Sequence, residues 1–153
     1  METLNYRRLS KQLLYEIKPL WEELNKIHLK DSIYFKDHYT SFNFDKRAAH
    51  WKDIPDENIY ILVIETEEGI LVGYCVSTIK GQSGEVDSLF LSMDYRGNGL
   101  GRQLLKKNID WLKSRNCRTI RLSVSYGHEN VVGFYKKMGL YPRLTVLEYK
   151  NSQ

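Results

Sequence analysis

The chain has 153 residues, of which 42% are hydrophobic and 27% charged, so it has the length and composition of one ordinary globular domain. No apolar run approaches the ~20 residues of a membrane span, and the first five residues lack the basic and apolar parts of a secretion signal. The net charge of +4 is dispersed along the chain, which favours a polyanionic small ligand over nucleic acid. We therefore expect one cytoplasmic domain spanning residues 1–153, with no membrane or nucleic-acid partner.

Cysteine usage gives no sign of a metal site or a disulfide framework. Cys75 lies inside a strand pattern and Cys117 lies just before another, and these two are the only cysteines of the chain. Both are expected to be reduced structural thiols, and no metal cofactor is expected.

The first third of the chain predicts a short strand followed by helices. Residues Tyr6–Leu9 form the strand, and apolar residues then recur at spacings of three and four. Pro19 either kinks this helix or marks the first turn of a new one. The aromatic segment Tyr34–Phe44 predicts a second helix packed on the core, with an aromatic substrate pocket as the alternative. The apolar stripe of the first helix consists of Leu13, Ile17, Leu20, Leu24 and Ile27.

A change of period at Ile59 marks the start of a sheet. Two β-rich runs, Ile59–Ile64 and Ile70–Val76, are separated by a short turn and predict a hairpin. A third run, Glu85–Ser92, follows a turn that contains two glycines. Together these runs predict an antiparallel meander.

The rest of the chain predicts a parallel β-α-β unit. A helix that begins after Gly101 leads back to a strand over Thr119–Val124. A last helix stops at Gly139 and gives way to a final strand near Leu144–Tyr149. The helix after Gly101 carries the apolar stripe Leu105, Ile109 and Leu112. The helix that stops at Gly139 holds Val131, Phe134, Tyr135 and Met138.

The turn before the first of these helices has glycines at positions 97, 99 and 101. A P-loop would need Lys and Ser or Thr after the last glycine, where this chain has Arg102 and Gln103. A dinucleotide-binding turn fits weakly, because its third glycine lies three residues after the second. Free N–H groups and the positive end of a helix dipole still favour a phosphate at this junction, with a plain strand-to-helix turn as the alternative.

Two motifs in this part of the chain resemble the signatures of one enzyme family. Arg96–Gly101 has the spacing R-x-x-G-x-G, and Asn130–Leu140 places Asn, Phe-Tyr and Gly along the last helix. Both resemble the signatures of the GNAT N-acetyltransferases, with Gly133 where the family usually has Ala and Leu140 where it often has Phe. The resemblance implies an α/β (α+β layered) GNAT fold. Its mixed central sheet would have about 6–7 strands, with an antiparallel N-terminal meander, a parallel β-α-β coenzyme-binding core and helices on both faces.

The resemblance also implies acetyl-CoA as the co-substrate. Backbone N–H groups of the glycine turn would receive the pyrophosphate, because glycine lets the backbone approach a ligand closely. Two arginines would add positive charge, with surface ion pairs as the alternative. The strand before the turn would carry a bulge, splay from the next strand and bind pantetheine through its backbone. The coenzyme-binding residues so implied are Phe90, Leu91, Met93, Arg96, Gly97, Asn98, Gly99, Leu100, Gly101, Arg102, Asn130 and Tyr135.

The implied reaction moves an acetyl group from the thioester to a primary amine in a ternary complex. An alkylamine with a pKa of ~10.4 is almost wholly protonated at neutral pH, so a base must take a proton before the amine attacks. Glu85 and Asp87 lie two residues apart in a predicted strand and hence on one face. Either could be this base, directly or through water, or could bind a cationic substrate instead. The resemblance assigns Tyr135 as the acid that protonates the departing thiolate.

The acceptor amine is left open by the sequence. The resemblance implies that the first two helices shape its site, here within Trp21–Trp51, whose aromatic and acidic side chains could suit a cationic amine. A polyamine, an aminoglycoside, another small amine and a protein amine all fit. The alternative function is a non-catalytic acetyl-CoA-binding sensor or partner domain. The final strand near an exposed edge could also support a homodimer.

Overall fold

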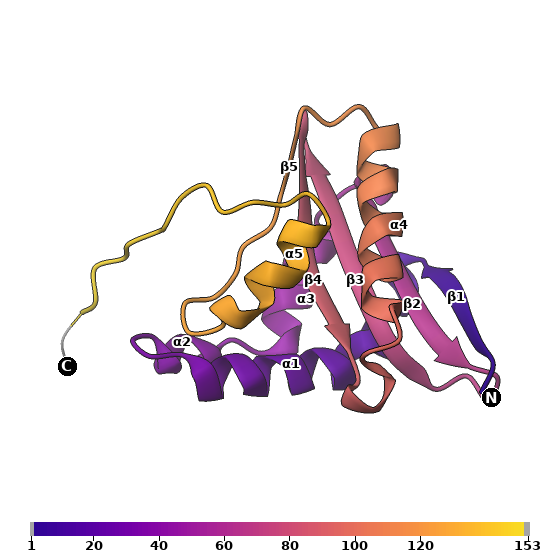
Figure 1. Cartoon of the computed structure of the whole chain (residues 1–153), viewed down its shortest axis with the longest axis horizontal. Coiled ribbons are helices and arrows are strands. Elements are labelled where there is room, and N and C mark those ends of the chain that lie inside the picture. The colour runs from indigo at the N-terminus through magenta and orange to yellow at the C-terminus, as the bar shows by residue number, and fades with distance from the viewer. Residues whose placement is uncertain (1, 152–153) are drawn as a thin grey trace.

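A five-stranded sheet divides the protein, with helices on both of its faces (Figure 1). In the computed structural model, which describes residues 2–151, the strand order follows the chain from β1 to β5. The strands are β1 (Leu4–Leu9), β2 (Ile59–Thr66), β3 (Leu71–Lys80), β4 (Ser83–Leu91) and β5 (Thr119–Arg121). The helices are α1 (Lys18–Asp31), α2 (Lys36–Ser41), α3 (Phe44–Lys52), α4 (Leu100–Ser114) and α5 (Val132–Lys137).

The sheet confirms the predicted meander and the predicted β-α-β unit. Strands β1 to β4 pair antiparallel in sequence order, and β4 pairs in parallel with β5 after the α4 crossover. The β4–β5 ladder runs only from the pair Ser83–Thr119 to the pair Glu85–Arg121. Beyond these pairs the two segments part. We call the gap between β4 and the chain that follows β5 the opening.

The N-terminal helices differ in detail from the predicted pair. Pro19 lies in the first turn of α1, and Lys11–Ile17 before it forms a 3₁₀ helix, so Pro19 starts a new helix. Its missing N–H costs nothing there, because first-turn N–H groups have no acceptor within the helix. The aromatic segment forms the short helices α2 and α3 in place of one helix. Asn43 separates them and caps α3 by accepting a hydrogen bond from the N–H of Lys46.

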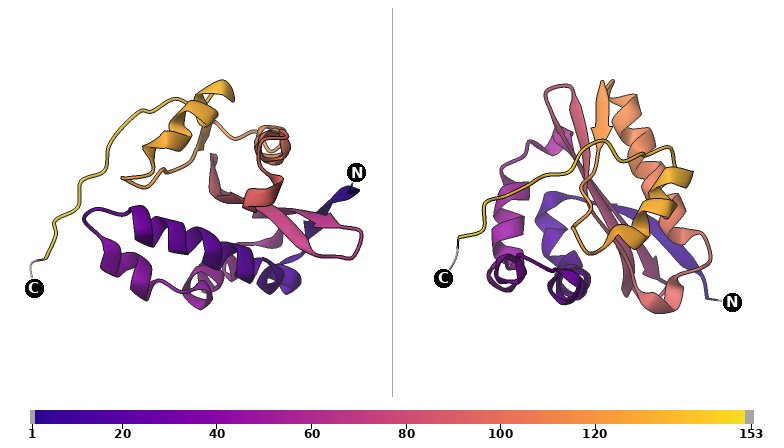
Figure 2. Two further views of the ribbon diagram at one scale, coloured as in Figure 1. Left: turned by 60° about the horizontal axis from the view of Figure 1, so that its bottom comes forward. Right: turned by 60° about the vertical axis from the view of Figure 1, so that its left-hand side comes forward.

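Each face of the sheet has its own hydrophobic core, and Figure 2 shows α1 and α3 on one side with α4 on the other. On the first face, Phe44 packs edge-on against both Trp21 and Trp51. Full burial of a large apolar side chain contributes about 1.5–3 kcal/mol, so these contacts hold α1 and α3 firmly on the sheet. The second core fixes α4 and includes Leu62, Val86, Leu104, Leu105 and Leu112.

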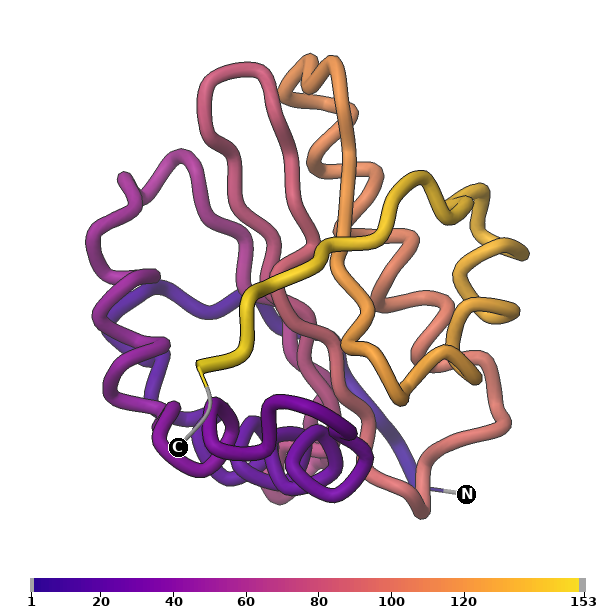
Figure 3. The backbone as a smooth tube through the Cα atoms, turned by 90° about the vertical axis from the view of Figure 1, so that its left-hand side faces the viewer, coloured from indigo at the N-terminus to yellow at the C-terminus, as the bar shows by residue number. Residues whose placement is uncertain are grey.

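The C-terminal segment corrects one prediction, because Leu144–Tyr149 is not a strand. Residues 141–151 are all exposed, and their backbone makes no hydrogen bond to the described residues. The segment leaves the body after α5 and runs away from the sheet in Figure 1, and in Figure 3 the same yellow chain crosses in front of the body. A strand needs a neighbour for its N–H and C=O groups, and the segment has none in its own chain. The sheet therefore has five strands, fewer than expected.

The last strand of the sheet is also shorter than predicted. β5 ends at Arg121, whereas the sequence predicted a strand up to Val124. The chain beyond Arg121 has parted from β4, so its backbone has lost the partner that a strand requires.

Two smaller observations complete the fold. Cys75 and Cys117 are both free thiols, as expected, and Cys75 is buried. None of the helices in residues 2–151 combines the length and the apolar character needed to span a bilayer.

Candidate active site

The glycine turn joins the end of β4 to the start of α4. A 3₁₀ turn at Met93–Tyr95 follows the strand, and Gly99 is the N-cap of α4. Gly97 and Gly99 have φ angles of 90° and 80°, in the left-handed region where a side chain is strained. Asn98 lies exposed between them. A Cβ at either glycine would meet no atom within 4 Å, so the backbone conformation is what requires glycine at both positions.

This turn presents backbone N–H groups that have no acceptor. The first helical hydrogen bond of α4 runs from the N–H of Gln103 to the carbonyl oxygen of Gly99. Within residues 2–151, nothing accepts from the N–H groups of Gly97, Gly99 and residues 100–102. These free N–H groups form the positive end of the α4 helix dipole. A site of this kind favours a bound anion.

The two arginines of the turn have different environments. Arg96 Nε donates to the carbonyl oxygen of Leu91 at 2.8 Å, and its guanidinium lies 5.3 Å from the centre of the Phe90 ring. Arg96 therefore ties the turn back to the end of β4. Arg102 is exposed in the first turn of α4 and forms no ion pair with the described part of the chain. Arg96 forms no ion pair with the described residues either, so the charges of both arginines are free for a bound anion.

Strand β4 carries the bulge that the family resemblance implied. Val76 pairs with Ser88 and Ser77 pairs with Val86, so Asp87 has no partner on β3. A bulge bends its strand and strengthens the local twist. Beyond this bulge β4 no longer pairs with β5, and the two chains part.

After the bulge, the end of β4 borders the opening with its backbone. Phe90 and Leu91 are buried in the cores on opposite faces of the sheet, while Met93 at the end of the stretch is 75% exposed. Because the side chains of Phe90 and Leu91 are packed, the opening beside them is bordered by main-chain groups. Such an edge can pair with an extended, amide-bearing ligand as with an added strand.

The predicted pair of carboxylates lies on the α3 face of the sheet. Asp87 Oδ2 accepts a hydrogen bond from Trp51 Nε1, and its Oδ1 accepts one from Thr78 Oγ1, both at 2.9 Å. Arg47 donates to the carbonyl oxygen of Asp87 at 3.0 Å. Glu85 lies two residues before Asp87 on β4, and the positive charge of Arg47 opposes the rise in the pKa of both carboxyl groups.

Both carboxyl groups bind protons more tightly than usual. Burial raises the pKa of Asp87, although the hydrogen bond from Trp51 opposes the shift by favouring the charged form. Burial also raises the pKa of Glu85, and the negative charge of Asp87 adds to the increase. No side chain in residues 2–151 forms an ion pair with the Glu85 carboxylate. Asp87 is therefore fixed in position, while Glu85 is free to accept a proton.

Tyr135 lies on the other face of the sheet, on α5. The ring of Phe134 comes within 4.0 Å of the place that a Cβ on Gly101 would take, so α5 packs over the start of α4. Burial raises the pKa of Tyr135 to about 12, which keeps the phenol protonated at neutral pH. Its hydroxyl donates to no acceptor in the described chain and remains available.

These groups surround one opening from two sides. The free N–H groups and Tyr135 belong to the face covered by α4 and α5, and the two carboxylates belong to the face covered by α3. Where neighbouring strands are paired, the sheet keeps the groups on its two faces apart. The parting of β4 from β5 is therefore the place where groups from the two faces can act on one reacting centre.

Comparison with known proteins agrees with this geometry. Residues 21–140, more than half of the chain, match the model of the acetyltransferase (GNAT) family. The chain belongs to this family. The resemblance found in its two motifs is thereby confirmed.

Named relatives of this GNAT chain differ in their acceptors. A Bacillus subtilis (strain 168) protein, provisionally named a [ribosomal protein bS18]-alanine N-acetyltransferase, is 33% identical over 88 residues, or 56% of this chain and 58% of its own length. Thialysine N-epsilon-acetyltransferase of Mus musculus is 28% identical over 80 residues, or 49% and 47%. The aminoglycoside N-acetyltransferase AAC(6')-Iy, solved with CoA, has a TM-score of 0.72 at 14% identity, with 99% and 96% of the two chains covered. This chain thus spans about half the length of the curated relatives, and the structural likeness shows the fold.

The loop between β5 and α5 of the GNAT chain carries the last predicted coenzyme residue. Asn130 lies in a 3₁₀ turn, Glu129–Val131, and its side chain is exposed. The turn lies between β5 and α5, so Asn130 is on the chain that follows the parting from β4.

The same loop is held against α1 and α2 by contacts that no sequence pattern predicted. His128 Nδ1 lies 3.2 Å from Asp31 Oδ2, and the hydroxyls of Tyr39 and Ser125 lie 2.8 Å apart in a hydrogen bond. Gly127 has a φ of 97°, and a Cβ there would collide with the carbonyl oxygen of Asp31, so glycine is required. We call this set of contacts the α1 clasp.

Sequence reasoning also missed the residues that hold Asp87. Arg47 and Trp51 lie four apart on α3, and the Arg47 guanidinium stacks 4.5 Å from the Trp51 ring. This i, i+4 spacing was the one available signal, because it puts both side chains on one helix face. The third residue that holds Asp87 is Thr78 on the neighbouring strand β3, and no sequence pattern pointed to it.

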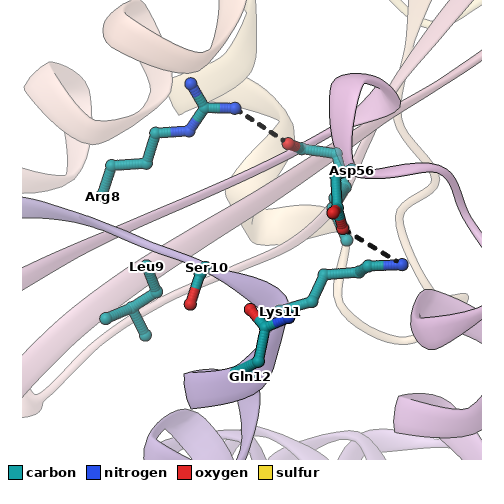
Figure 4. A pocket seen from close by; sticks show the side chains of 7 residues that line it. Arg8, Leu9, Ser10, Lys11, Gln12 and Asp56 are labelled. Atoms are coloured by element: carbon teal, nitrogen blue, oxygen red, sulfur yellow. Dashed lines mark hydrogen bonds and ion pairs between the residues drawn. The ribbon is translucent and has the colours of Figure 1, made fainter.

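One cavity lies elsewhere, beside the end of β1 and the start of β2 (Figure 4). It has a volume of about 360 Å³ and is lined by residues such as Arg8, Lys11 and Asp56. Its charged groups are already paired, since Lys11 Nζ lies 3.4 Å from Asp56 Oδ1 and Arg8 donates to the Ile59 carbonyl oxygen. No cluster of three metal-ligating side chains occurs in the described chain.

Proposed function

We propose that the protein is an acetyl-CoA-dependent N-acetyltransferase that moves an acetyl group to a primary amine by direct attack in a ternary complex. One observation carries this proposal: the opening between β4 and β5 has an anion-binding turn and a phenol on one face and two carboxylates on the other. A thioester entering from the first face and an amine entering from the second would meet there.

The coenzyme would bind through the first face. The N–H groups of Gly97 to Arg102 would receive its pyrophosphate, with Asn98 exposed beside them and Arg102 adding charge. The pantetheine arm, rich in amides, would hydrogen-bond to the backbone of Phe90, Leu91 and Met93 at the open edge of β4. Asn130 would hold the arm from the opposite side of the opening.

We assign Glu85 as the base and Asp87 as the group that raises its basicity. Both Asp87 oxygens already accept hydrogen bonds, whereas Glu85 forms no ion pair with the described residues. The negative charge of Asp87 raises the pKa of Glu85, and a base is most effective when its pKa lies near the operating pH. If the amine reaches Asp87 first, the two roles are exchanged.

Tyr135 would complete the reaction as the acid. The carboxylate first takes a proton from the ammonium group, and the neutral nitrogen then forms a bond to the thioester carbon and releases a second proton to water. The carbon–sulfur bond then breaks, and the electron pair leaves with the sulfur. The protonated phenol of Tyr135 can donate to this thiolate as the negative charge develops.

The acceptor belongs to the second face. A protonated amine would reach Glu85 on the α3 face, where the negative charges of Glu85 and Asp87 favour a cationic group. The named relatives support an amino group on a protein, a thialysine or an aminoglycoside as candidates, and a polyamine fits the same charge.

Acetyl-CoA titration followed by a thiol-release assay over an amine panel tests the function. We expect acetyl-CoA to bind and thiol release to rise with at least one amine. Binding without turnover on any amine would favour the non-catalytic sensor or partner domain. Absence of binding would overturn the proposal.

A further inference from the structure

Ser88 is the residue of β4 that directly follows the bulge. It pairs with Val76 on β3, and further along the same ladder Tyr74 pairs with Phe90. Directly opposed residues of an antiparallel pair point to the same face of a sheet. Val76, Tyr74 and Phe90 all belong to the core that packs against α1 and α3. The side chain of Ser88 therefore lies on the α3 face.

The bulge brings the side chains of Ser88 and Asp87 to one face. Along a regular strand consecutive side chains point to opposite faces, so Ser88 would point away from Asp87. The extra residue breaks this alternation, because Asp87 bonds to Trp51 of α3 while Ser88 faces the same core. Ser88 also comes after Glu85, the last residue of β4 that pairs with β5. A hydroxyl group thus joins the carboxylates on the stretch of β4 that borders the opening.

A buried tyrosine holds the Ser88 hydroxyl in place. The hydroxyl oxygens of Tyr74 and Ser88 lie 2.7 Å apart, and Tyr74 is 0% exposed. Burial raises the pKa of Tyr74, so its phenol keeps its proton at neutral pH. Among residues 2–151, Ser88 is the one hydrogen-bond partner of this phenol. The two hydroxyl groups therefore form a short chain that leads from the core to the opening.

The burial of Tyr74 fixes which of the two oxygens donates. If Ser88 donated to Tyr74, the phenol proton would be buried without an acceptor, which is unfavourable. Tyr74 therefore donates to Ser88 Oγ. The Ser88 hydroxyl keeps its own proton, and no acceptor in the described part of the chain takes it. Because Ser88 is only partly buried, this proton can reach a bound ligand.

The chemistry of the site selects the ligand atom that this proton suits. An ammonium group has no lone pair to accept it, and a neutral amine needs its lone pair for the attack. The carboxylate oxygens of Asp87 already accept from Trp51 and Thr78. The carbonyl oxygen of a thioester can accept, and it gains negative charge when the amine attacks. A donor that is fixed in place before the reaction stabilises this charge more than it stabilises the neutral carbonyl.

We propose that Ser88 is a further catalytic residue, whose hydroxyl donates a hydrogen bond to the carbonyl oxygen of the acetyl thioester, with Tyr74 as its positioning residue. The inference rests on the proposed function, because it assigns one more group to the same transfer. As the amine nitrogen bonds to the carbonyl carbon, the π electron pair moves onto the oxygen, and Ser88 keeps its proton while its hydrogen bond strengthens. When the carbon–sulfur bond breaks, the pair returns and restores the carbonyl. The bond from Tyr74 makes Ser88 a better donor, because hydrogen bonds in a chain polarise one another.

Steady-state kinetics and calorimetry of four chains test the role of Ser88. Ser88→Ala should lower kcat by roughly 10²-fold, as loss of one oxyanion donor does, while acetyl-CoA affinity stays within about twofold. Tyr74→Phe should lower kcat by about tenfold and should add little to Ser88→Ala, because both act on one hydrogen bond.

Ser77→Ala is the matched control. Ser77 Oγ also forms a bond of 2.7 Å, to the buried Asn108 on the opposite face of the sheet, so this variant loses an equivalent structural contact. It should lower the unfolding temperature and leave kcat unchanged, whereas Ser88→Thr, which keeps a hydroxyl, should recover most of the rate lost in Ser88→Ala. An unchanged kcat in Ser88→Ala, or equal losses in Ser88→Ala and Ser77→Ala, would overturn the inference.

Infrared spectroscopy of bound acetyl-CoA with an isotope-labelled carbonyl tests the contact without any amine. A hydrogen bond weakens the carbonyl double bond, so we expect its stretching band at a lower frequency in the natural chain and in Ser77→Ala than in Ser88→Ala. Equal band positions in the three chains would overturn the role of Ser88, and thiol release by the natural chain would then leave the proposed function intact. If the natural chain binds no acetyl-CoA, the proposed function fails, and this inference fails with it.

Discussion

The two faces of the sheet, which we propose bind the coenzyme and the acceptor amine, are built in different ways. The α4 and α5 face takes its parts from one continuous stretch, in which the glycine turn, α4 and α5 follow one another. The α3 face assembles distant parts: Trp51 and Asp87 are 36 residues apart, and Tyr39 and Ser125 are 86 residues apart. The coenzyme half is thus specified by local sequence, and the acceptor half by tertiary contacts.

This difference explains how one scaffold can serve several amines. The free N–H groups depend on the helix start and on two glycines in the left-handed region, so they survive changes elsewhere. The acceptor half depends on which side chains α1, α2 and α3 bring to the opening. The relatives and the solved neighbour, which are named for an alanine, a thialysine and an aminoglycoside, agree with a constant half and a variable half.

The largest effect is expected from the base on the acceptor face. Glu85→Gln should lower kcat/KM by roughly 10³-fold, because the amine then keeps its proton. Asp87→Asn should cost only about tenfold and should move the acidic limb of the rate profile to lower pH, because loss of its negative charge lowers the pKa of Glu85. Steady-state kinetics from pH 5 to 9 measures both. A larger loss in Asp87→Asn than in Glu85→Gln would exchange the two roles.

A smaller loss is expected on the coenzyme face from the acid. Tyr135→Phe removes the donor to the thiolate and should lower kcat by roughly 10²-fold, while acetyl-CoA binding by calorimetry stays unchanged. Tyr15→Phe, which removes a hydroxyl bonded to Asp45 on the surface, serves as the matched control. Full activity in Tyr135→Phe would rule out its role as the acid.

The sequence predicted the continuous half of the site well. The order of strands, the β-α-β unit and the glycine turn follow from periodicity and from glycine spacing, which are local properties. Glu85 and Asp87 lie on one face as the period of two predicted, even though Asp87 occupies a bulge. Only the family resemblance predicted the bulge, because one extra residue does not visibly change the alternation of side chains along β4.

The sequence could not predict contacts that depend on how distant segments meet. The α1 clasp joins Asp31 to His128, and nothing in either segment points to the other. The wrong prediction, a final strand at Leu144–Tyr149, shows a related limit. Periodicity reports that a segment can form a strand, whereas pairing decides whether it does, and the partner edge can belong to another chain.

Backbone strain introduced into the glycine turn should weaken acetyl-CoA binding without changing the binding of the amine. Gly99→Val places a branched side chain at a φ of 80°, where a residue other than glycine costs about 1–2 kcal/mol, and the turn must shift to relieve it. We expect acetyl-CoA affinity to fall roughly tenfold while the KM for the amine stays constant. Calorimetry and steady-state kinetics provide the two values.

The chain offers a matched control for this variant. Gly81 in the β3–β4 turn has a φ of 62° and open space around it, so Gly81→Val brings similar backbone strain at the end of β4 opposite the coenzyme turn. It should lower the unfolding temperature as much as Gly99→Val without changing acetyl-CoA affinity. Equal losses of affinity in both variants would mean that the effect is one of stability alone.

The smallest effect concerns the α1 clasp and its response to pH. His28 lies beside the clasp, 5.6 Å from His128 between ring centres, and its Nδ1 is buried without a partner among the described residues. Burial, with the nearby charge of His128, lowers the pKa of His28 to about 4, although Asp31 opposes the shift. The unfolded chain, with an ordinary His pKa of ~6.5, therefore binds a proton that the folded chain does not.

The sign of this effect fixes the prediction. Between pH ~6.5 and about 4 the stability of the natural chain should fall as the pH falls, and above pH ~6.5 His28 should make no difference. His28→Phe keeps a ring of similar shape without the charge, so its unfolding temperature should depend less on pH in that window, whereas His38→Phe, at an exposed position, should leave the dependence unchanged. Thermal unfolding at pH 7 and pH 4.5 measures all three chains. Parallel losses in the natural chain and His28→Phe would show that another group controls the acid response, and the α1 clasp would then be insensitive to the histidine buried against it.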